Sequence, residues 1–182
     1  MTRRKLYEWF YHIYNRWFDK KRLFFNTKDY ERLYRKIIDL TNRTDNSINI
    51  ISFCFLQNHF HFVVSLTPGS RTPGLEIAEF FWSLQNSYAK YFNHKYSRKW
   101  QVFESRFKSK MIKSEDYLNK CLSYVNFNAL KHWLVGNVFE WPFSSIFQLN
   151  WKRVDTKYVL RISNKWLEFS LTDNIMLPEL EF

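Results

Sequence analysis

The sequence predicts an α+β fold of the ferredoxin-like, split-βαβ type: an antiparallel sheet with helices on one side, plus an added C-terminal helix. Four segments show the apolar alternation or short β-branched runs of strands, and three show helical spacing. In chain order these segments are strand, helix, strand, strand, helix, strand, helix, which is that fold with one helix added. At 182 residues, 46% of them hydrophobic, the chain can bury one full core but has little length for a second.

The first strand is expected within Glu8–Trp17, because this segment is rich in aromatic and β-branched residues. A basic turn at 19–22 follows. Thr27 then suits the N-cap of a helix whose apolar positions, from Tyr30 to Thr41, recur at helical spacing.

Two apolar runs come next, Ser47–Leu56 and Phe60–Leu66, and only Gln57 and Asn58 separate them. Their length and β-branched content predict a hairpin of two strands.

The second half begins with a helical pattern over Leu75–Asn93. Trp100–Ile112 resembles a further strand. Ser114 suits the start of a last helix that runs to about Leu134, where Gly136 suits its C-terminal end. We expect residues 1–148 to form one domain that includes this last helix. Residues 149–182 are expected to form a C-terminal extension, to which the sequence assigns no role.

Lys and Arg outnumber Asp and Glu by 28 to 17, a formal charge of +11. This excess of positive charge in a folded chain predicts that its partner is nucleic acid. The alternative is a basic surface that faces only solvent. A membrane is not expected, since the most apolar stretch, Ile48–Leu66, is broken by polar residues. Met1–Lys5 is followed by aromatic and charged residues rather than an apolar signal core. Cys54 and Cys121, far apart and without a CxxC, indicate reduced, buried thiols in a cytoplasmic protein.

His59 and His61 flank Phe60 at the start of a predicted strand, so both imidazoles project from one face. Their Cα atoms should lie roughly 6–7 Å apart, a span that two imidazoles can close onto one ion. Phe62 and Val64 continue the face of Phe60 into a core. The pair therefore predicts a metal site, while two ordinary strand histidines would give the same pattern.

Tyr124 and Asn128 lie four residues apart on the last predicted helix, which puts phenol and carboxamide on one face. A tyrosine can attack a phosphodiester and form a covalent phosphotyrosine link. An amide oxygen one turn away could complete a metal shell or orient the phosphate. Spacing alone does not single out Tyr124, because the chain has eleven tyrosines and a tyrosine packed in the core would fit equally well.

The expected ligand set determines which metal fits. Two histidines and at most one amide leave positions open for phosphate oxygens and water. No thiolate or carboxylate closes the shell as in a structural zinc site. An open site of nitrogen and oxygen ligands with a phosphate substrate fits Mg²⁺ or Mn²⁺.

A basic, aromatic stretch covers residues 95–113, with Glu104 as its single acid. Three basic residues at alternate positions share one face of the predicted strand, which suits successive phosphates. They are Arg106, Lys108 and Lys110. Aromatic residues between them could stack unpaired bases, although a solvent-facing strand with alternating charges has the same pattern. Arg16 and the nearby residues 20–22 form a smaller basic cluster.

Several ordered blocks between Tyr11 and Ser145 resemble the REP-associated tyrosine transposases. These belong to the single-tyrosine transposases of the His-hydrophobe-His (HUH) superfamily and carry an insertion sequence 200-like domain. The blocks are Tyr11–Ile13 with Arg16, Phe53–Val64 around Asn58-His59-Phe60-His61, Ser87–Asn93, Phe103–Ser109, Tyr124–Asn128 and Trp141–Ser145.

The resemblance implies that Tyr124 is the nucleophile, that His59 and His61 bind the metal, and that Asn128 has an accessory metal or phosphate role. It also implies a single-stranded DNA substrate, often beside a hairpin, cut to leave a 5′-phosphotyrosine and a free 3′-hydroxyl. The chain would then be a DNA-binding HUH endonuclease acting in DNA transposition and recombination. We expect Arg16 and the three basic residues of the predicted strand to contact the DNA backbone.

Three residues depart from the family pattern. Gln57 and Ala129 replace prolines, and Trp17 replaces a glycine. None of these changes removes a chemical group from the expected site, but Trp17 leaves open which hairpin or flanking bases are recognised. Two rival functions also stay open at this point: a catalytically inactive or domesticated DNA-binding protein, and a metal-dependent phosphoesterase that uses water. The sequence does not distinguish a monomer from a homodimer.

Overall fold

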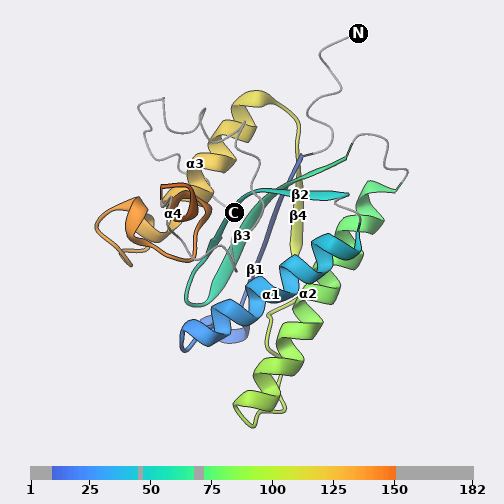
Figure 1. Ribbon diagram of the computed structural model, residues 1–182, viewed down its shortest axis with the longest axis vertical. Helices are drawn as coiled ribbons and strands as arrows, with labels where there is room; N and C mark the ends of the chain where they lie inside the picture. Colours follow the sequence, from blue (N-terminus) through green and yellow to red (C-terminus); the bar gives the residue numbers. More distant parts are fainter. Residues whose placement is uncertain (1–9, 45–46, 68–71, 151–182) are drawn as a thin grey trace.

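The computed structural model describes residues 10–44, 47–67 and 72–150 (Figure 1). The element order is the predicted one, followed by a short additional helix. The elements are β1 (Phe10–Arg16), α1 (Thr27–Arg43), β2 (Ile48–Phe55), β3 (His59–Leu66), α2 (Pro73–Lys95), β4 (Lys108–Ile112), α3 (Glu115–Lys131) and α4 (Ser145–Asn150), with 3₁₀ turns at Phe18–Lys20 and Val138–Glu140.

The four strands form one sheet in the order β2-β3-β1-β4, and every neighbouring pair is antiparallel. Both helical connections cross to a strand that is not an immediate neighbour, which is the ferredoxin-like arrangement that the sequence predicts. Helices α1 and α2 pack together over one face, while α3 lies over the other (Figure 1). The predicted fold class is confirmed.

Alternation along the strands gives each face its own core. On β1, Tyr11 and Ile13 join the cluster under α1 and α2, whereas Phe10 joins the cluster under α3. On β3, Phe60 and Phe62 face α1 and α2. The residues that alternate with these two, His59 and His61 among them, therefore face α3.

A buried hydrogen-bond network fixes α3 on the sheet. The hydroxyls of Ser52 on β2 and Ser145 on α4 both donate to Asn126 Oδ1, at 2.8 and 3.0 Å. The indole of Trp141 donates to the carbonyl of Phe55 at 2.9 Å. Since buried polar groups without partners are costly, this network restricts α3 to one position and so places Tyr124, two residues before Asn126.

Two predicted helix ends are wrong by a few residues. The N-cap of α1 is Asn26, not Thr27, and the backbone N–H groups of Phe25 and Asn26 donate to the Asp29 carboxylate. Helix α3 begins after Ser114 as predicted, but it ends at Lys131 and Gly136 does not cap it.

The predicted strand Trp100–Ile112 is wrong in its first half, since β4 covers only Lys108–Ile112. Tyr14 on β1 pairs with Lys108, and the next bridge joins Trp17 to Phe103. Two residues of β1 (15 and 16) thus lie opposite four residues (104–107), and two extra residues cannot continue a ladder. Asn15 Nδ2 holds the looped segment by donating to the Ser105 carbonyl at 2.9 Å.

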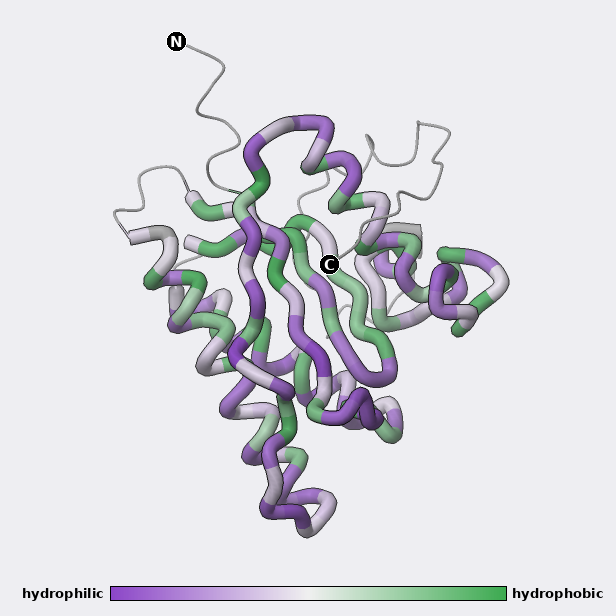
Figure 2. Tube along the Cα trace, turned by 180° about the vertical axis from the view of Figure 1, so that it is seen from behind, coloured by the Kyte–Doolittle hydropathy of each residue, from purple (hydrophilic) through white to green (hydrophobic). Residues whose placement is uncertain are grey.

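The sheet's edge at β4 is hydrophilic over Lys108, Ser109 and Lys110 and hydrophobic at Met111 and Ile112, and the colouring of Figure 2 changes accordingly along this strand. Helix α4 spans the predicted domain boundary at 148/149, and residues 151–182 of the predicted extension lie outside the described residues. Cys54 and Cys121 are free and buried, as expected. Among the described helices, none is both long and apolar enough to cross a membrane.

Candidate functional site

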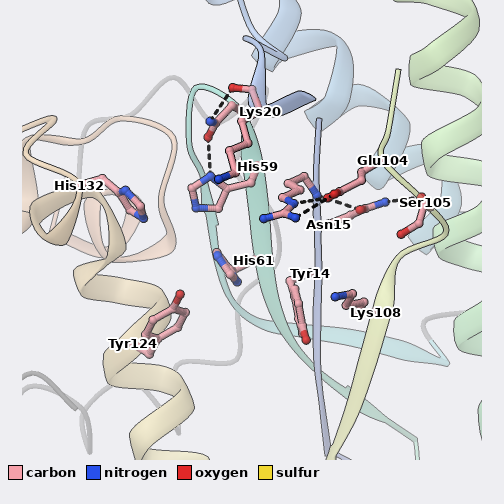
Figure 3. A pocket seen from close by; sticks show the side chains of 12 residues that line it. Tyr14, Asn15, Lys20, His59, His61, Glu104, Ser105, Lys108, Tyr124 and His132 are labelled. Atoms are coloured by element: carbon pink, nitrogen blue, oxygen red, sulfur yellow. Dashed lines mark hydrogen bonds and ion pairs between the residues drawn. The ribbon is translucent and has the colours of Figure 1, made fainter. Parts of the chain in front are cut away.

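A pocket of about 460 Å³ opens between β1, β3, the 104–108 segment and α3 (Figure 3). It lies on the α3 side of the sheet, at the end where β1 leaves it and β3 begins. Its lining is Tyr14, Asn15, Arg16, Lys20, Asn58, His59, His61, Glu104, Ser105, Lys108, Tyr124 and His132. Several charged and hydrogen-bonding groups therefore converge on one cavity large enough for a nucleotide-sized ligand.

The two histidines of β3 project into this pocket from neighbouring alternate positions. His59 lies opposite Arg16 and His61 opposite Tyr14 in the β1–β3 ladder. Their rings lie 5.1 Å apart, centroid to centroid, and nearly perpendicular to each other. His61 is only 5% exposed, so the pocket floor is deep at this ring.

Tyr124 reaches the same place from α3. Its ring lies edge-on to His61, with centroids 5.2 Å apart and planes at 89°. The structure thus brings together the late-helix phenol and the paired imidazoles, on the same side of the sheet (Figure 3). Burial raises the pKa of the Tyr124 phenol, so the hydroxyl keeps its proton near neutral pH.

Asn128 lies one helical turn beyond Tyr124 and is completely buried. Neither amide atom has a hydrogen-bond partner among the described residues. The amide approaches His59 and Tyr124 without reaching good hydrogen-bond geometry. The Asn128 amide nevertheless opposes the effects of burial, because it raises the pKa of His59 and lowers the pKa of Tyr124. A buried, unsatisfied amide of this kind marks a place for a ligand or ion.

Second partners orient the two imidazoles. His59 Nδ1 lies 2.6 Å from Asn58 Oδ1, so this nitrogen carries the proton and Nε2 keeps its lone pair. Burial, with a smaller contribution from His132, lowers the pKa of His59 to about 4. Burial and the neighbouring histidines hold the pKa of His61 well below its usual range. Both rings are therefore neutral at neutral pH, the form that binds metals.

The described residues contain no group of three or more His, Cys, Asp or Glu side chains placed to hold a metal ion. A metal in this pocket would rest on His59 and His61, which line it, and on the Asn128 amide, which is completely buried and is not among the lining residues. The His61 Nε2 atom and the amide are both buried and lack hydrogen-bond partners among the described residues, which fits such an ion. The open donor set suits Mg²⁺ or Mn²⁺ with water and phosphate oxygens completing the shell.

The predicted basic residues are only partly brought together. Lys108 lines the pocket, and Lys110 shares its face of β4, lying opposite His12 of β1. Arg106 lies two residues before β4, in the looped segment, so the predicted row of three on one strand face is wrong in its first member. Arg16 lines the pocket with its guanidinium already paired, through two nitrogens, with the Glu104 carboxylate.

Several pocket residues were missed by the sequence analysis. His132 follows Tyr124 and Asn128 at the same four-residue interval, and that spacing is a signal that could have found it. Its ring lies 4.9 Å from that of His59. Tyr14 lies two residues after His12 on the same face of β1 as Arg16, a position that only the sheet register reveals. The other missed lining residues are Asn15, Asn58 and Ser105, whereas Lys20 belongs to the smaller basic cluster that the sequence indicated.

Comparison with known proteins shows which family this chain resembles. The family model described as "Transposase IS200 like" matches residues 5–128. The solved structure of a REP-associated tyrosine transposase bound to a REP hairpin is 21% identical, with a TM-score of 0.60, 90% of this chain and 98% of that chain covered. A crystal structure from Deinococcus radiodurans, described as that of a transposase, is 14% identical, with a TM-score of 0.44 and coverages of 69% and 94%. No curated protein matches significantly.

Proposed function

The chain belongs to the IS200-like transposase family, and we propose that it cuts and rejoins single-stranded DNA through attack of Tyr124 on a phosphodiester. The observation that carries this proposal is the 5.2 Å approach of the Tyr124 and His61 rings within one pocket. A single chain supplies the phenol and both imidazoles. A monomer would therefore suffice to complete the site.

His59, His61 and Asn128 would hold a divalent ion, Mg²⁺ or Mn²⁺. When bound, such an ion polarises the scissile phosphate and stabilises the charge that develops on the leaving oxygen. The three side chains contribute neutral donors only, so the positive charge of an ion held there would be left to attract the phosphate. The Asn58 contact to His59 fixes one of these donors before the ion arrives.

In the proposed step, the Tyr124 oxygen bonds to phosphorus and the bond from phosphorus to the 3′ oxygen breaks. The products are a 5′-phosphotyrosine and a free 3′-hydroxyl. Because burial raises the pKa of Tyr124, the phenol gives up its proton to solvent water only as the new bond forms, and the 3′ oxygen takes up a proton from solvent as it leaves. The covalent link keeps the energy of the broken bond, so the reverse attack by a 3′-hydroxyl rejoins a strand.

Basic residues around the pocket would guide the DNA backbone. Lys108 and Lys110 project from the α3 face of β4, and Arg16 on the neighbouring strand β1 also lines the pocket. Arg106, in the exposed segment before β4, extends this basic edge. The structural relative is bound to a REP hairpin, and we extend hairpin-bearing single strands to this chain as its substrate class. Two free thiols fit the cytoplasm as its compartment.

The test of the nucleophile uses Tyr124→Phe and a labelled single-stranded hairpin oligonucleotide with Mg²⁺ or Mn²⁺. We expect the wild type to form a covalent adduct on a denaturing gel and the variant to form none, while still binding the DNA. Tyr34→Phe, on the other face of the sheet, is the matched control and should retain the adduct.

The same gel separates the rival functions. An adduct that persists in Tyr124→Phe would refute the nucleophile. Cleavage without any adduct would instead indicate a phosphoesterase that uses water, and binding without cleavage would indicate a DNA-binding protein only.

The metal site has its own test in His59→Ala. Loss of one of three proposed ligands should lower cleavage by at least an order of magnitude with either ion, because the scissile phosphate is no longer polarised. Cleavage rates across a metal titration provide the measurement. An unchanged rate at every metal concentration would remove His59 from the metal site.

A further inference from the structure

His12, on β1, contacts the proposed metal ligand His61. His12 Nε2 lies 3.2 Å from His61 Nδ1, and the two rings stack with centroids 5.3 Å apart and planes at 18°. His12 is completely buried. It does not line the pocket, so substrate does not meet it directly.

This contact restricts where His61 can carry its proton. The hydrogen bond contains one proton, which lies either on His61 Nδ1 or on His12 Nε2. If it lies on His12, the neutral His61 ring must carry its own proton on Nε2, the atom that faces the pocket. That atom has no hydrogen-bond partner among the described residues, and a protonated nitrogen cannot bind a metal.

We propose that His12 is a positioning residue, whose Nε2 accepts the proton of His61 Nδ1 and so keeps the His61 Nε2 lone pair directed at the metal. The inference rests on the proposed function, because it assigns His12 a task in that same site. In this arrangement both proposed metal ligands donate a hydrogen bond from Nδ1 to a neighbouring side chain. His59 donates to Asn58 Oδ1, and His61 donates to His12 Nε2. Ligand histidines commonly hold such second partners, and their loss weakens metal binding by roughly 10–100-fold.

Local packing supports this role over that of an ordinary core residue. His12 stacks on Tyr14 at 5.0 Å and lies edge-on to Tyr124 at 6.1 Å, so an apolar aromatic ring would fill the same volume. A buried imidazole carries two polar atoms that a phenylalanine does not. The ring contacts of His12 therefore explain why an aromatic side chain lies here, but they do not explain its two nitrogen atoms. The hydrogen bond to His61 accounts for one of these nitrogens.

The experiment compares His12→Phe, which keeps an aromatic ring, with His12→Gln, whose amide oxygen can still accept a proton from Nδ1. The first readout is the imidazole tautomer of His61 in the metal-free full chain, measured by ¹⁵N NMR and assigned among the five histidines by substitution. We expect Nδ1 protonation in the wild type, a shift toward Nε2 protonation in His12→Phe, and restoration in His12→Gln.

The second readout is Mn²⁺ affinity, measured by electron paramagnetic resonance without DNA. We expect a loss of about 10-fold or more in His12→Phe and at least partial rescue in His12→Gln. Tyr34→Phe is the control for removing a buried polar atom elsewhere. Circular dichroism establishes that each variant is folded, and the tautomer comparison between wild type and His12→Gln holds even if His12→Phe does not fold.

Protonation of His61 on Nε2 in the wild type would overturn the inference, and so would equal Mn²⁺ affinity in folded His12→Phe. Those results leave the proposed function standing if the wild type still forms the Tyr124 adduct. A wild type that neither binds Mn²⁺ nor forms an adduct overturns the proposed function and this inference together. A correct tautomer and weakened Mn²⁺ binding support the inference whatever the cleavage assay gives.

Discussion

Trp133 adopts a left-handed backbone conformation, with φ of 56°, just beyond the end of α3. The N–H of Trp133 donates to the Leu130 carbonyl and that of Leu134 to the Ala129 carbonyl, which is the Schellman pattern of helix ends. Glycine usually occupies this position because a side chain makes the left-handed conformation unfavourable by about 1–2 kcal/mol. Trp133 is 91% exposed, so little packing offsets that strain.

We therefore expect Trp133→Gly to raise the free energy of unfolding by about 0.5–1 kcal/mol, the strain relief being partly offset by the greater freedom of glycine in the unfolded chain. Urea denaturation measures it. Trp82→Gly removes another exposed tryptophan, but inside α2, where glycine is unfavourable, and should lower stability by roughly 0.5 kcal/mol. A decrease in both variants would contradict the assignment of strain to Trp133.

At the residue scale, the sequence predicts those site residues that lie close together in the chain. His59 with His61 and Tyr124 with Asn128 were found from strand and helix periodicity, and their roles remain predictions. His12 was quoted only as part of a family block, because its contact with His61 depends on the pairing of β1 with β3, which spacing does not reveal.

At the scale of elements, one buried carboxylate ties the start of α1 to the end of α2. Asp29 is completely buried and accepts hydrogen bonds from Lys95 at 2.6 Å, Tyr96 at 2.7 Å and Tyr91 at 2.9 Å. Burial alone would raise the pKa of Asp29. These bonds, together with that from the Phe25 N–H, outweigh it, and the pKa lies below its ordinary value of 3.8.

A carboxyl whose pKa is lowered by folding stabilises the native state above its unfolded-state pKa and loses that contribution as pH falls. The wild type should therefore lose stability, relative to Asp29→Asn, as pH is lowered from about 4 through the depressed pKa. Urea denaturation at a series of pH values provides the comparison. A difference in stability between the two proteins that does not change below pH 4 would contradict the lowered pKa.

Among the elements, α4 was not predicted, whereas the four strands and helices α1 to α3 were, because periodicity is a local property of the sequence. The residue at which β4 starts was not predicted, because it depends on how β4 pairs with β1. Two extra residues break the ladder beyond Lys108, and this break moves Arg106 off the strand. Nor did the sequence predict where α3 ends, since Trp133 takes the place usually held by glycine.

At the scale of the molecule, the formal charge of +11 is not all available to a ligand at the pocket. Arg16 is engaged by Glu104, and a DNA phosphate at this edge of the pocket would have to compete with that carboxylate. We therefore expect Glu104 to lower the affinity of the pocket for a polyanion, both by its own charge and by occupying the guanidinium.

Glu104→Gln should accordingly bind a single-stranded oligonucleotide several-fold more tightly than the wild type at moderate salt. The logarithm of the binding constant should also fall more steeply with salt, by roughly 0.7 for one added phosphate contact. Fluorescence anisotropy across a salt series measures both. Glu31→Gln makes the same change of charge on α1, beside Arg35. Equal effects of the two variants would show that net charge alone matters and that the Arg16 pair does not.

Fold and family follow from patterns that extend along most of the chain, whereas the chemistry depends on a few side chains brought together from β1, β3 and α3. The most direct measurement of that chemistry is mass spectrometry of the proteolysed covalent protein–DNA adduct, formed on a hairpin oligonucleotide with Mn²⁺. The account predicts a single nucleotide-bearing peptide, with the 5′-phosphate attached to Tyr124. Attachment to any other tyrosine, or cleaved DNA with an unattached 5′-phosphate, would contradict it.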